Sequence, residues 1–264
     1  MKELIEKKLF LLDMDGTIYV ENKLIPGAKD FLDILKKQGK DYVFLTNNSS
    51  KSVKNYLEKL HSLDIYADES NMFSSGQATS FYLKEMKKKA KLYVVGTESF
   101  KNDLAKDGFT IVENIKQEID YLVVGFDTEL NYEKLEKACE LIDRNVNYIA
   151  TNPDLICPIK DGRFIPDCGA ICNMLETATK KTPFYIGKPR KEMVEIVSKL
   201  KNIDLKDIAV IGDRLYTDIA CGINAGVTSV LVLTGETKKE DVKNTEFVPD
   251  FTFDSINDLY QIIK

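Results

Sequence analysis

Short apolar segments alternate with segments of helical spacing along most of this chain, and this alternation constrains its fold more than any other feature. Between the apolar segments lie helix patterns, such as the apolar stripe of 135–142 and the segment 28–38, which Gly39 closes. The alternation predicts an α/β fold, with a parallel sheet covered by helices on both faces. The eight predicted strands are residues 9–13, 42–46, 92–95, 121–125, 148–150, 184–186, 208–211 and 229–233.

The overall charge and composition exclude several classes of protein. Acidic residues outnumber basic ones by 42 to 37, which gives a net charge of −5. That balance is a poor basis for binding the phosphates of nucleic acids or an anionic membrane. No apolar run approaches the roughly 18 residues that a membrane span needs. We therefore expect a soluble globular protein with neither a nucleic acid nor a membrane as its partner.

The cysteines indicate a reducing compartment. Five are spread along the chain without a Cys-x-x-Cys pair, and His61 is the only histidine. Neither a disulfide framework nor a zinc site is therefore expected. The charged segment 1–8 does not resemble a signal peptide, so we expect a cytoplasmic protein.

Two carboxylates follow the first predicted strand directly. The sequence Asp13-Met14-Asp15-Gly16-Thr17 places Asp13 and Asp15 two residues apart. In an extended chain this spacing puts both side chains on one side, about 6.5–7 Å apart. The pair could bind a divalent cation or act on opposite ends of one substrate. An ordinary Asx turn after a strand is the alternative.

Two further strands end in groups that could bind phosphate. Thr46 ends the strand 42–46 and Asn47 follows it, where a hydroxyl and main-chain N–H groups can hold an anion. Lys188 follows the strand 184–186, where its ammonium could neutralise a phosphoryl group. Helix capping by the polar residues, and an exposed lysine in a turn, are the alternatives.

A second pair of carboxylates follows the strand 208–211. Asp213 comes directly after Gly212, and Asp218 lies at the start of an expected helix that ends near Gly226. Hard oxygen ligands at a strand end suit Mg²⁺. A turn for Asp213 and a helix cap for Asp218 are the alternatives.

These polar side chains together follow four strands of one expected parallel sheet. Ligand sites in such sheets lie beyond the carboxyl ends of the strands. The set supplies a nucleophile, an acid/base, a phosphate clamp and a metal site, which are the parts of phosphoryl transfer through a covalent intermediate. The set also falls in two blocks, 13–48 and 187–218, which predicts one domain with a second domain inserted in its middle.

These motifs, in this order, resemble the haloacid dehalogenase (HAD) superfamily. More narrowly, the chain is similar to the branch that contains the NagD-type nucleotide phosphatases, 4-nitrophenylphosphatases, phosphoglycolate phosphatase and pyridoxal phosphatase. The likeness covers nearly the whole chain. Besides the catalytic motifs, it includes segments 45–49, 125–127, 151–154, 169–170 and 187–189.

The resemblance implies a Rossmann-like core of residues 1–76 and 183–264, with a large α/β cap domain of residues 77–182 inserted. It also implies a Mg²⁺-dependent phosphatase that hydrolyses a small phosphorylated metabolite, and it leaves a homodimer open. The substrate stays open among nucleoside monophosphates, sugar phosphates, phosphoglycolate and pyridoxal phosphate, because cap loops choose the leaving group.

The resemblance and the residue chemistry assign the same roles to the motif residues. Asp13 is expected to attack phosphorus and form an aspartyl-phosphate, and Asp15 is expected to act as general acid and then as base. Thr46, the main chain of Asn47 and Lys188 are expected to bind the phosphate oxygens. The expected Mg²⁺ ligands are Asp13, the main-chain carbonyl of Asp15, Asp213 and Asp218, the last directly or through water.

Two other functions and the role of the cap residues stay open. A phosphomutase or phosphotransferase would pass the phosphoryl group to a sugar rather than to water, and a signalling receiver would hold it without catalysis. Dinucleotide binding is not expected, because no Gly-x-Gly-x-x-Gly follows a predicted strand. Asp127, Asn152 and the segment 167–173 either contact the leaving group or only cap helices and shape loops.

Overall fold

The computed structural model describes residues 2–159 and 162–264, and its internal contacts divide the chain into two compact units. Residues 160 and 161 of the expected cap lie outside the described residues. The sequence-derived domain bounds stay a proposal. Unit 1 contains Met1–Thr46, Val53–Phe73 and Lys188–Lys264, and unit 2 contains Asn47–Ser52 and Ser74–Gly187.

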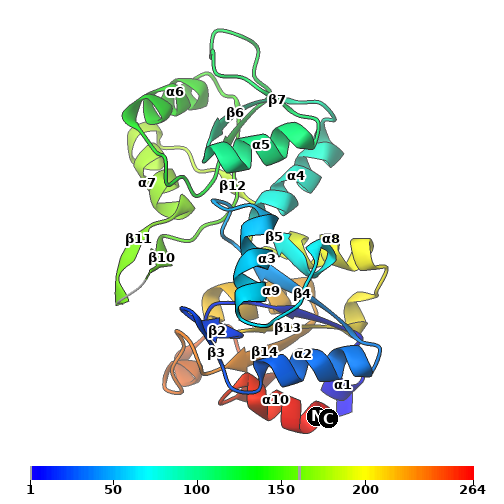
Figure 1. Ribbon diagram of the computed structural model, residues 1–264. Helices are drawn as coiled ribbons and strands as arrows, with labels where there is room; N and C mark the ends of the chain where they lie inside the picture. Colours follow the sequence, from blue (N-terminus) through cyan, green and yellow to red (C-terminus); the bar gives the residue numbers. More distant parts are fainter. Residues whose placement is uncertain (1, 160–161) are drawn as a thin grey trace. The chain divides into compact units, whose positions relative to one another are not determined.

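Unit 1 contains a six-stranded sheet (Figure 1). Its strands, in spatial order, are β15 (Phe251–Phe253), β14 (Thr228–Val232), β13 (Ile208–Gly212), β1 (Leu9–Leu12), β4 (Asp41–Thr46) and β5 (Met72–Ser74). The first five run parallel, and the register places Phe10 of β1 beside Ala209 of β13 and Tyr42 of β4. All four residues of β1 are fully buried, as a central parallel strand covered on both faces requires.

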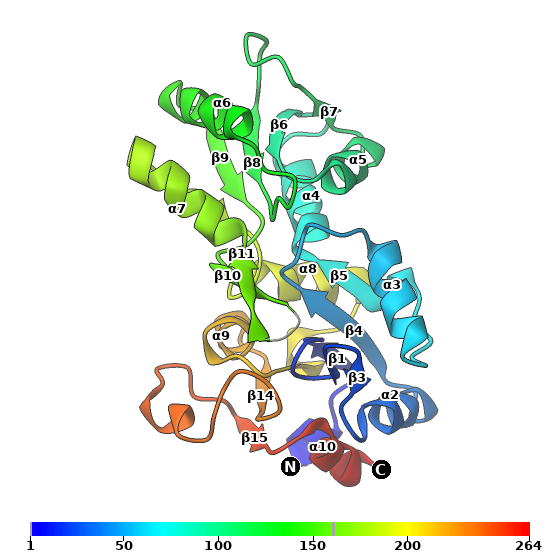
Figure 2. The ribbon, with the colours of Figure 1, turned by 60° about the vertical axis from the view of Figure 1, so that its left-hand side comes forward.

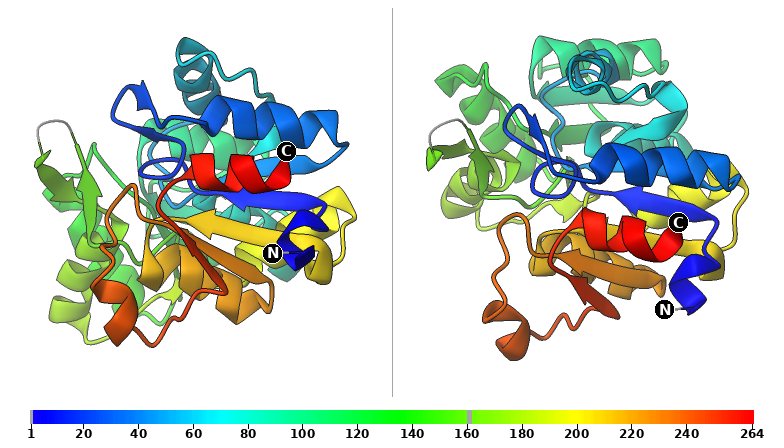
Figure 3. Two further views of the ribbon diagram at one scale, coloured as in Figure 1. Left: turned by 90° about the horizontal axis from the view of Figure 1, so that it is seen from below. Right: turned by 60° about the horizontal axis from the view of Figure 1, so that its bottom comes forward.

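Helices cover both faces of this sheet, as Figure 3 shows. One face and its apolar core are covered by α2 (Ala28–Lys37), α3 (Val53–Ser62) and α10 (Ile256–Ile263). The other is covered by α8 (Glu192–Lys201) and α9 (Ala220–Ala225). The shorter elements of unit 1 are α1 (Lys2–Ile5), β2 (Tyr19–Val20), β3 (Lys23–Leu24), η1 (Glu69–Asn71), η3 (Leu205–Asp207), η4 (Leu215–Ile219) and η5 (Asp241–Asn244).

Helix α2 illustrates how the sequence specifies these elements. It buries Ala28, Phe31, Leu32 and Leu35, which lie at helical spacing on one face. The helix ends at Lys37, and Gly39 follows with a positive φ of 69°. The predicted helix 28–38 and its glycine stop are therefore confirmed.

Unit 2 contains a five-stranded parallel sheet. Helices α6 and α7 lie on one side of it, and α4 and α5 lie on the other (Figure 2). In spatial order the strands are β12 (Phe184–Tyr185), β9 (Asn147–Ala150), β8 (Tyr121–Val124), β6 (Lys91–Val95) and β7 (Thr110–Ile111). The helices are α4 (Ser75–Met86), α5 (Glu98–Lys106), α6 (Tyr132–Asp143) and α7 (Cys168–Thr179), and β10 (Ile156–Pro158) pairs with β11 (Phe164–Pro166) as an antiparallel ribbon.

All eight predicted strands are present, each within one residue of its predicted ends, and the α/β fold is confirmed. One part of the topology was wrong. The strand before Lys188 was expected in the same sheet as β1, whereas β12 pairs with β9 in the sheet of unit 2. A short apolar run predicts a strand, but the sheet that it joins depends on contacts far away in the sequence. The strands β5 and β15 were not predicted.

Among the residues that the structure describes, no helix combines the length and the apolar composition needed to cross a membrane.

Candidate active site

Three buried or partly buried carboxylates meet at one edge of the sheet in unit 1. Asp13 follows β1, Asp213 follows β13, and Asp218 lies in η4. One oxygen from each lies within 4.8 Å of the others. β1 and β13 are parallel neighbours, so their carboxyl ends deliver Asp13 and Asp213 to the same edge. The structure thus brings together three of the residues that the sequence motifs singled out.

Lys188 joins two of these carboxylates. Its Nζ donates to Asp13 Oδ1 at 2.7 Å and to Asp218 Oδ1 at 2.6 Å. A third bond, to the carbonyl oxygen of Leu45 in β4, measures 3.2 Å. The Lys188 side chain is only 4% exposed, so the alternative of an exposed lysine in a turn is wrong.

The electrostatics of this cluster favour a further cation. Burial raises the pKa of Asp13 to about 7, although the charge of Lys188 opposes that rise. Burial, followed by the charges of Asp13 and Asp218, raises the pKa of Asp213 to about 8. Asp213 Oδ1 is buried and has no hydrogen-bond partner among the described residues. Clustered carboxylate oxygens of this kind fit a hard divalent cation such as Mg²⁺.

Two glycines allow the main chain to approach Asp213 closely. Gly16 has a positive φ of 85°, and a Cβ there would lie 2.6 Å from the Asp213 carboxyl carbon. A Cβ at Gly235 would overlap the same carboxylate. The two glycine segments are tied together, because Thr234 Oγ1 donates to the Gly16 carbonyl at 2.5 Å. Any larger residue at either position would displace the carboxylate.

Asp15 lies outside the carboxylate cluster. Its side chain is 61% exposed, and Lys59 Nζ lies 3.9 Å from its Oδ2. The expected metal ligand in Asp15 is its main-chain carbonyl oxygen, so the exposure of its side chain does not conflict with that expectation. An exposed carboxylate next to the cluster can exchange protons with a substrate or with water.

Thr46 and Asn47 are adjacent in sequence but belong to different units. Thr46 ends β4, the neighbour of β1, and is 8% exposed. Asn47 begins the short segment of unit 2. Its carbonyl oxygen accepts from Asn152 Nδ2 at 2.7 Å and from Ser75 Oγ at 2.5 Å. Its side-chain amide donates to Asp154 at 3.1 and 3.2 Å. The Asn47 main chain is therefore held by unit 2.

The other candidates in unit 2 make contacts that hold loops and helix ends. Asp127 forms a 2.7 Å ion pair with Lys134 and accepts from the N–H of Glu129. Asn152 Oδ1 accepts from the N–H of Asp154. Asp167 caps α7. These contacts favour loop shaping and capping, which the sequence had left open beside a substrate contact.

Sequence reasoning missed several groups around the cluster. The N–H of Glu236 donates to Asp213 Oδ2 at 2.6 Å, and the Glu236 side chain pairs with Arg214 at 2.9 Å. The N–H of Arg214 in turn donates to Asp218 Oδ2. Glu236 comes shortly after the predicted strand 229–233. A search for acidic residues at the ends of predicted strands, which identified Asp13, could therefore have found Glu236 as well. Lys59 lies in mid-helix and offers no such signal.

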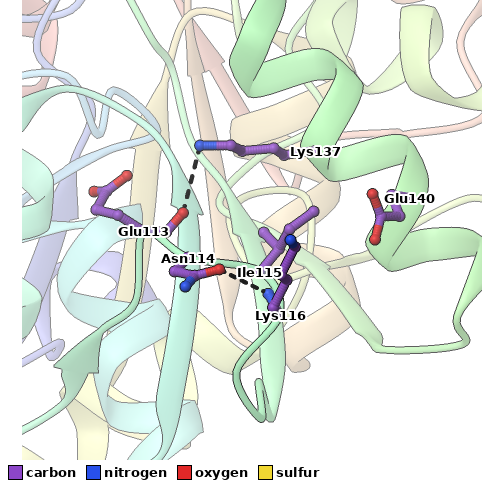
Figure 4. Close-up of a pocket in the computed structure, with 6 residues that line it drawn as sticks. All are labelled: Glu113, Asn114, Ile115, Lys116, Lys137 and Glu140. Carbon is purple, nitrogen blue, oxygen red and sulfur yellow. Dashed lines mark hydrogen bonds between the residues drawn. The ribbon is translucent and has the colours of Figure 1, made fainter.

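A separate hollow of about 430 Å³ lies in unit 2 (Figure 4). Both acidic and basic side chains line the hollow, and Lys137 Nζ donates to the Glu113 carbonyl at 3.4 Å. No residue of the predicted site lines it. Its lining residues are Glu113, Asn114, Ile115, Lys116, Lys137 and Glu140.

The fold is α/β, and the carboxylates and Lys188 at the edge of its sheet form a candidate active site. Residues 10–110 match the family model described as haloacid dehalogenase-like hydrolase, and residues 185–259 match a HAD-hydrolase-like model. The chain belongs to the haloacid dehalogenase-like hydrolases. This confirms the resemblance inferred from the motifs.

Three relatives define its place within the family. The chain is 35% identical to the 5'-nucleotidase YutF of Bacillus subtilis, over 95% of this chain and 96% of the relative. It is 33% identical to an acid sugar phosphatase of Staphylococcus haemolyticus, over 95% and 94%. The crystal structure of a 4-nitrophenylphosphatase from Thermotoga maritima matches with a TM-score of 0.94 and 38% identity, over 99% of both chains. The expected enzyme class, phosphoric monoester hydrolase, is confirmed.

Proposed function

We propose that the chain is a Mg²⁺-dependent phosphatase that hydrolyses small phosphate monoesters through a phosphorylated Asp13. The observation that carries this proposal is the ammonium of Lys188, which lies 2.7 Å from Asp13 and 2.6 Å from Asp218. A buried lysine beside a candidate nucleophile can bind the phosphoryl group that the nucleophile attacks. The names of the three relatives support a small phosphorylated metabolite as substrate.

The reaction proceeds in two displacements at phosphorus. An Asp13 carboxylate oxygen attacks phosphorus as the bond to the leaving oxygen breaks, and Asp15 donates its proton to that oxygen. The Asp15 carboxylate then accepts a proton from water, whose oxygen attacks phosphorus and releases Asp13 and inorganic phosphate. Lys188, Thr46 and the Asn47 main chain hold the phosphate oxygens in both steps.

The groups that we assign to Mg²⁺ are carboxylates of the cluster and one main-chain carbonyl. Asp213 Oδ1, which has no hydrogen-bond partner in the part of the chain that the structure describes, and the raised pKa values of Asp13 and Asp213 support this assignment. When bound, Mg²⁺ supplies positive charge that reduces the repulsion between an anionic nucleophile and an anionic phosphate. The assigned ligands are Asp13, Asp213, Asp218 and the carbonyl oxygen of Asp15.

Phosphate release from 4-nitrophenyl phosphate, with and without Mg²⁺, tests the proposal. We expect metal-dependent release in the wild type and a loss of at least about 10⁴-fold in Asp13→Asn, because the variant lacks the nucleophile. Equal turnover by the well-folded variant would exclude Asp13 as nucleophile. Transfer of the phosphoryl group to an added sugar, rather than to water, would instead identify a phosphotransferase.

A panel of phosphate esters would then identify the substrate class. Comparing kcat/KM for nucleoside monophosphates, sugar phosphates, phosphoglycolate and pyridoxal phosphate ranks the leaving groups. The cytoplasmic location, the homodimer and the domain bounds 1–76 with 183–264 and 77–182 stay predictions beside this proposal.

A further inference from the structure

We infer that Lys59 is a positioning residue for Asp15, and this inference rests on the acid/base role proposed above. Lys59 lies on α3, and its Nζ is 3.9 Å from Asp15 Oδ2. The same Nζ lies 3.7 Å from the centre of the Tyr19 ring. Lys59, Asp15 and Tyr19 all belong to unit 1.

The main chain that carries Asp15 is held by a closed loop. The N–H of Gly16 donates to the carbonyl of Tyr19 at 2.8 Å, and the N–H of Ile18 donates to that of Met14 at 2.8 Å. Asp15 and Tyr19 also form an isolated β-bridge. The Asp15 side chain, in contrast, is 61% exposed. Its carboxylate therefore extends from a fixed main chain, and its direction depends on side-chain neighbours such as Lys59.

Lys59 is held from two sides. Its helix buries Tyr56 and Leu60 in the core of unit 1, which fixes the main chain beneath Lys59. Its ammonium lies over the ring of Tyr19, a residue only 2% exposed. An exposed ion pair contributes little order by itself. The buried ring therefore fixes the ammonium, and the ammonium in turn orients the Asp15 carboxylate.

The expected consequence depends on the leaving group. Asp15 protonates the leaving oxygen, and this proton matters most when the departing group is a strong base. A misdirected Asp15 should therefore slow the cleavage of poor leaving groups more than that of good ones. Lys59 acts only through Asp15 in this scheme, so it should not change the reaction of a substrate that needs no proton.

The experiment compares kcat/KM for 4-nitrophenyl phosphate with that for phenyl phosphate. Phenol, with a pKa of about 10 like the tyrosine side chain, is the poorer leaving group of the two. The ratio kcat/KM includes only steps up to departure of the leaving group, so hydrolysis of phospho-Asp13 does not enter. Because a general acid contributes about 10²–10⁴-fold, we expect Lys59→Met to lower kcat/KM about 10-fold for phenyl phosphate and less than about 3-fold for 4-nitrophenyl phosphate.

Two further variants make the comparison specific. Lys54 lies on the same helix, is 82% exposed and has Glu58 3.9 Å away. Lys54→Met should therefore leave kcat/KM unchanged for both substrates. Lys59→Arg should restore most of the loss, since a guanidinium can also lie over Tyr19 and pair with Asp15. An equal loss on both substrates in Lys59→Met, or no loss at all, would overturn the inference.

Asp15→Asn separates this inference from the proposed function. If it shows the larger loss on phenyl phosphate while Lys59→Met does not, the acid role stands and the role of Lys59 fails. If Asp15→Asn affects both substrates equally, the acid role itself is wrong, and the inference about Lys59 fails with it.

Discussion

In unit 1 two of three clustered carboxylates share the ammonium of Lys188, whereas in unit 2 the carbonyl of Asn47 accepts from two neutral side chains. Asp13, Asp213 and Asp218, when ionised, carry three negative charges against the single positive charge of Lys188. The polar groups around Asn47 find their partners among Asn152, Ser75 and Asp154.

The difference separates a cluster with an excess of negative charge from a network of paired hydrogen bonds. Like charges in a buried cluster are unfavourable until a cation joins them, as the raised pKa values of Asp13 and Asp213 indicate. Satisfied buried hydrogen bonds, in contrast, stabilise one arrangement of the chain. Variants in the first region should therefore change catalysis and metal binding, and variants in the second should change stability.

Among the substitutions that compare these two regions, the largest effect is expected from Lys188→Ala. The variant removes the ammonium that we assign to the phosphate oxygens, so turnover in Mg²⁺ should fall by about 10²–10³-fold. Lys191→Ala is the matched control, because Lys191 is 53% exposed and its ammonium pairs with Glu195 at 2.9 Å. Near-normal turnover of folded Lys188→Ala would contradict the assignment.

Removing one carboxylate should change the response to metal. In the wild type, Mg²⁺ at about 100 times its Kd should stabilise the protein by about 2.7 kcal/mol, and Asp213→Asn should lose most of this gain. Differential scanning calorimetry, with EDTA and with Mg²⁺, measures both. An unchanged Mg²⁺ shift in the variant would place the metal elsewhere.

The same variant should behave in the opposite way without metal. Because the folded-state pKa values of Asp13 and Asp213 lie above the ordinary carboxyl value of about 4, the metal-free wild type should lose stability as pH rises toward 7 and 8. Asp213→Asn removes one of these charges, so its melting temperature in EDTA should fall less over that interval. A parallel decline in both proteins would show that the cluster does not limit stability.

A smaller effect is expected where a charge is introduced into the Asn47 network. Asn47→Asp replaces the amide donor with a second carboxylate opposite Asp154, and this should cost about 1–3 kcal/mol of unfolding free energy. Denaturant unfolding measures the loss. Adding Asp154→Asn should recover most of it by exchanging donor and acceptor; absence of recovery would mean that this pair is not coupled.

The smallest effect is expected from Ser75→Ala. It removes one of two donors to the Asn47 carbonyl and leaves the bond from Asn152, so we expect a loss of about 0.5–1.5 kcal/mol with little change in kcat. Unfolding and turnover can be measured on the same preparation. A loss of kcat comparable to that of Lys188→Ala would remove the distinction between the two regions.

Much of the fold and part of the site were predictable from local sequence. Each of the eight predicted strands is a short apolar run, and burial on both faces makes such a run recognisable without knowledge of its neighbours. Asp13 and Asp213 were expected together, because both directly follow strands and parallel strands place their carboxyl ends at one edge. These inferences need only the order of residues along the chain and the geometry of a parallel sheet.

Other parts of the site depend on contacts that no local pattern reports. The run before Lys188 predicts a strand, yet β12 joins the sheet of unit 2. Lys59 is one of several lysines on or near helices, and only the docking of α3 brings it to Tyr19 and Asp15.

Local sequence was enough to predict the strands and the α/β class, and to select the residues that we assign to phosphoryl transfer. Those features depend on periodicity and on side-chain type, which are properties of a few neighbouring residues. Three features became apparent only from the folded chain: the sheet that β12 joins, the two carboxylates that share Lys188, and the approach of Lys59 to Asp15. Those pairings join residues far apart in the chain, and they exist only where the packing of the whole core holds both partners in place.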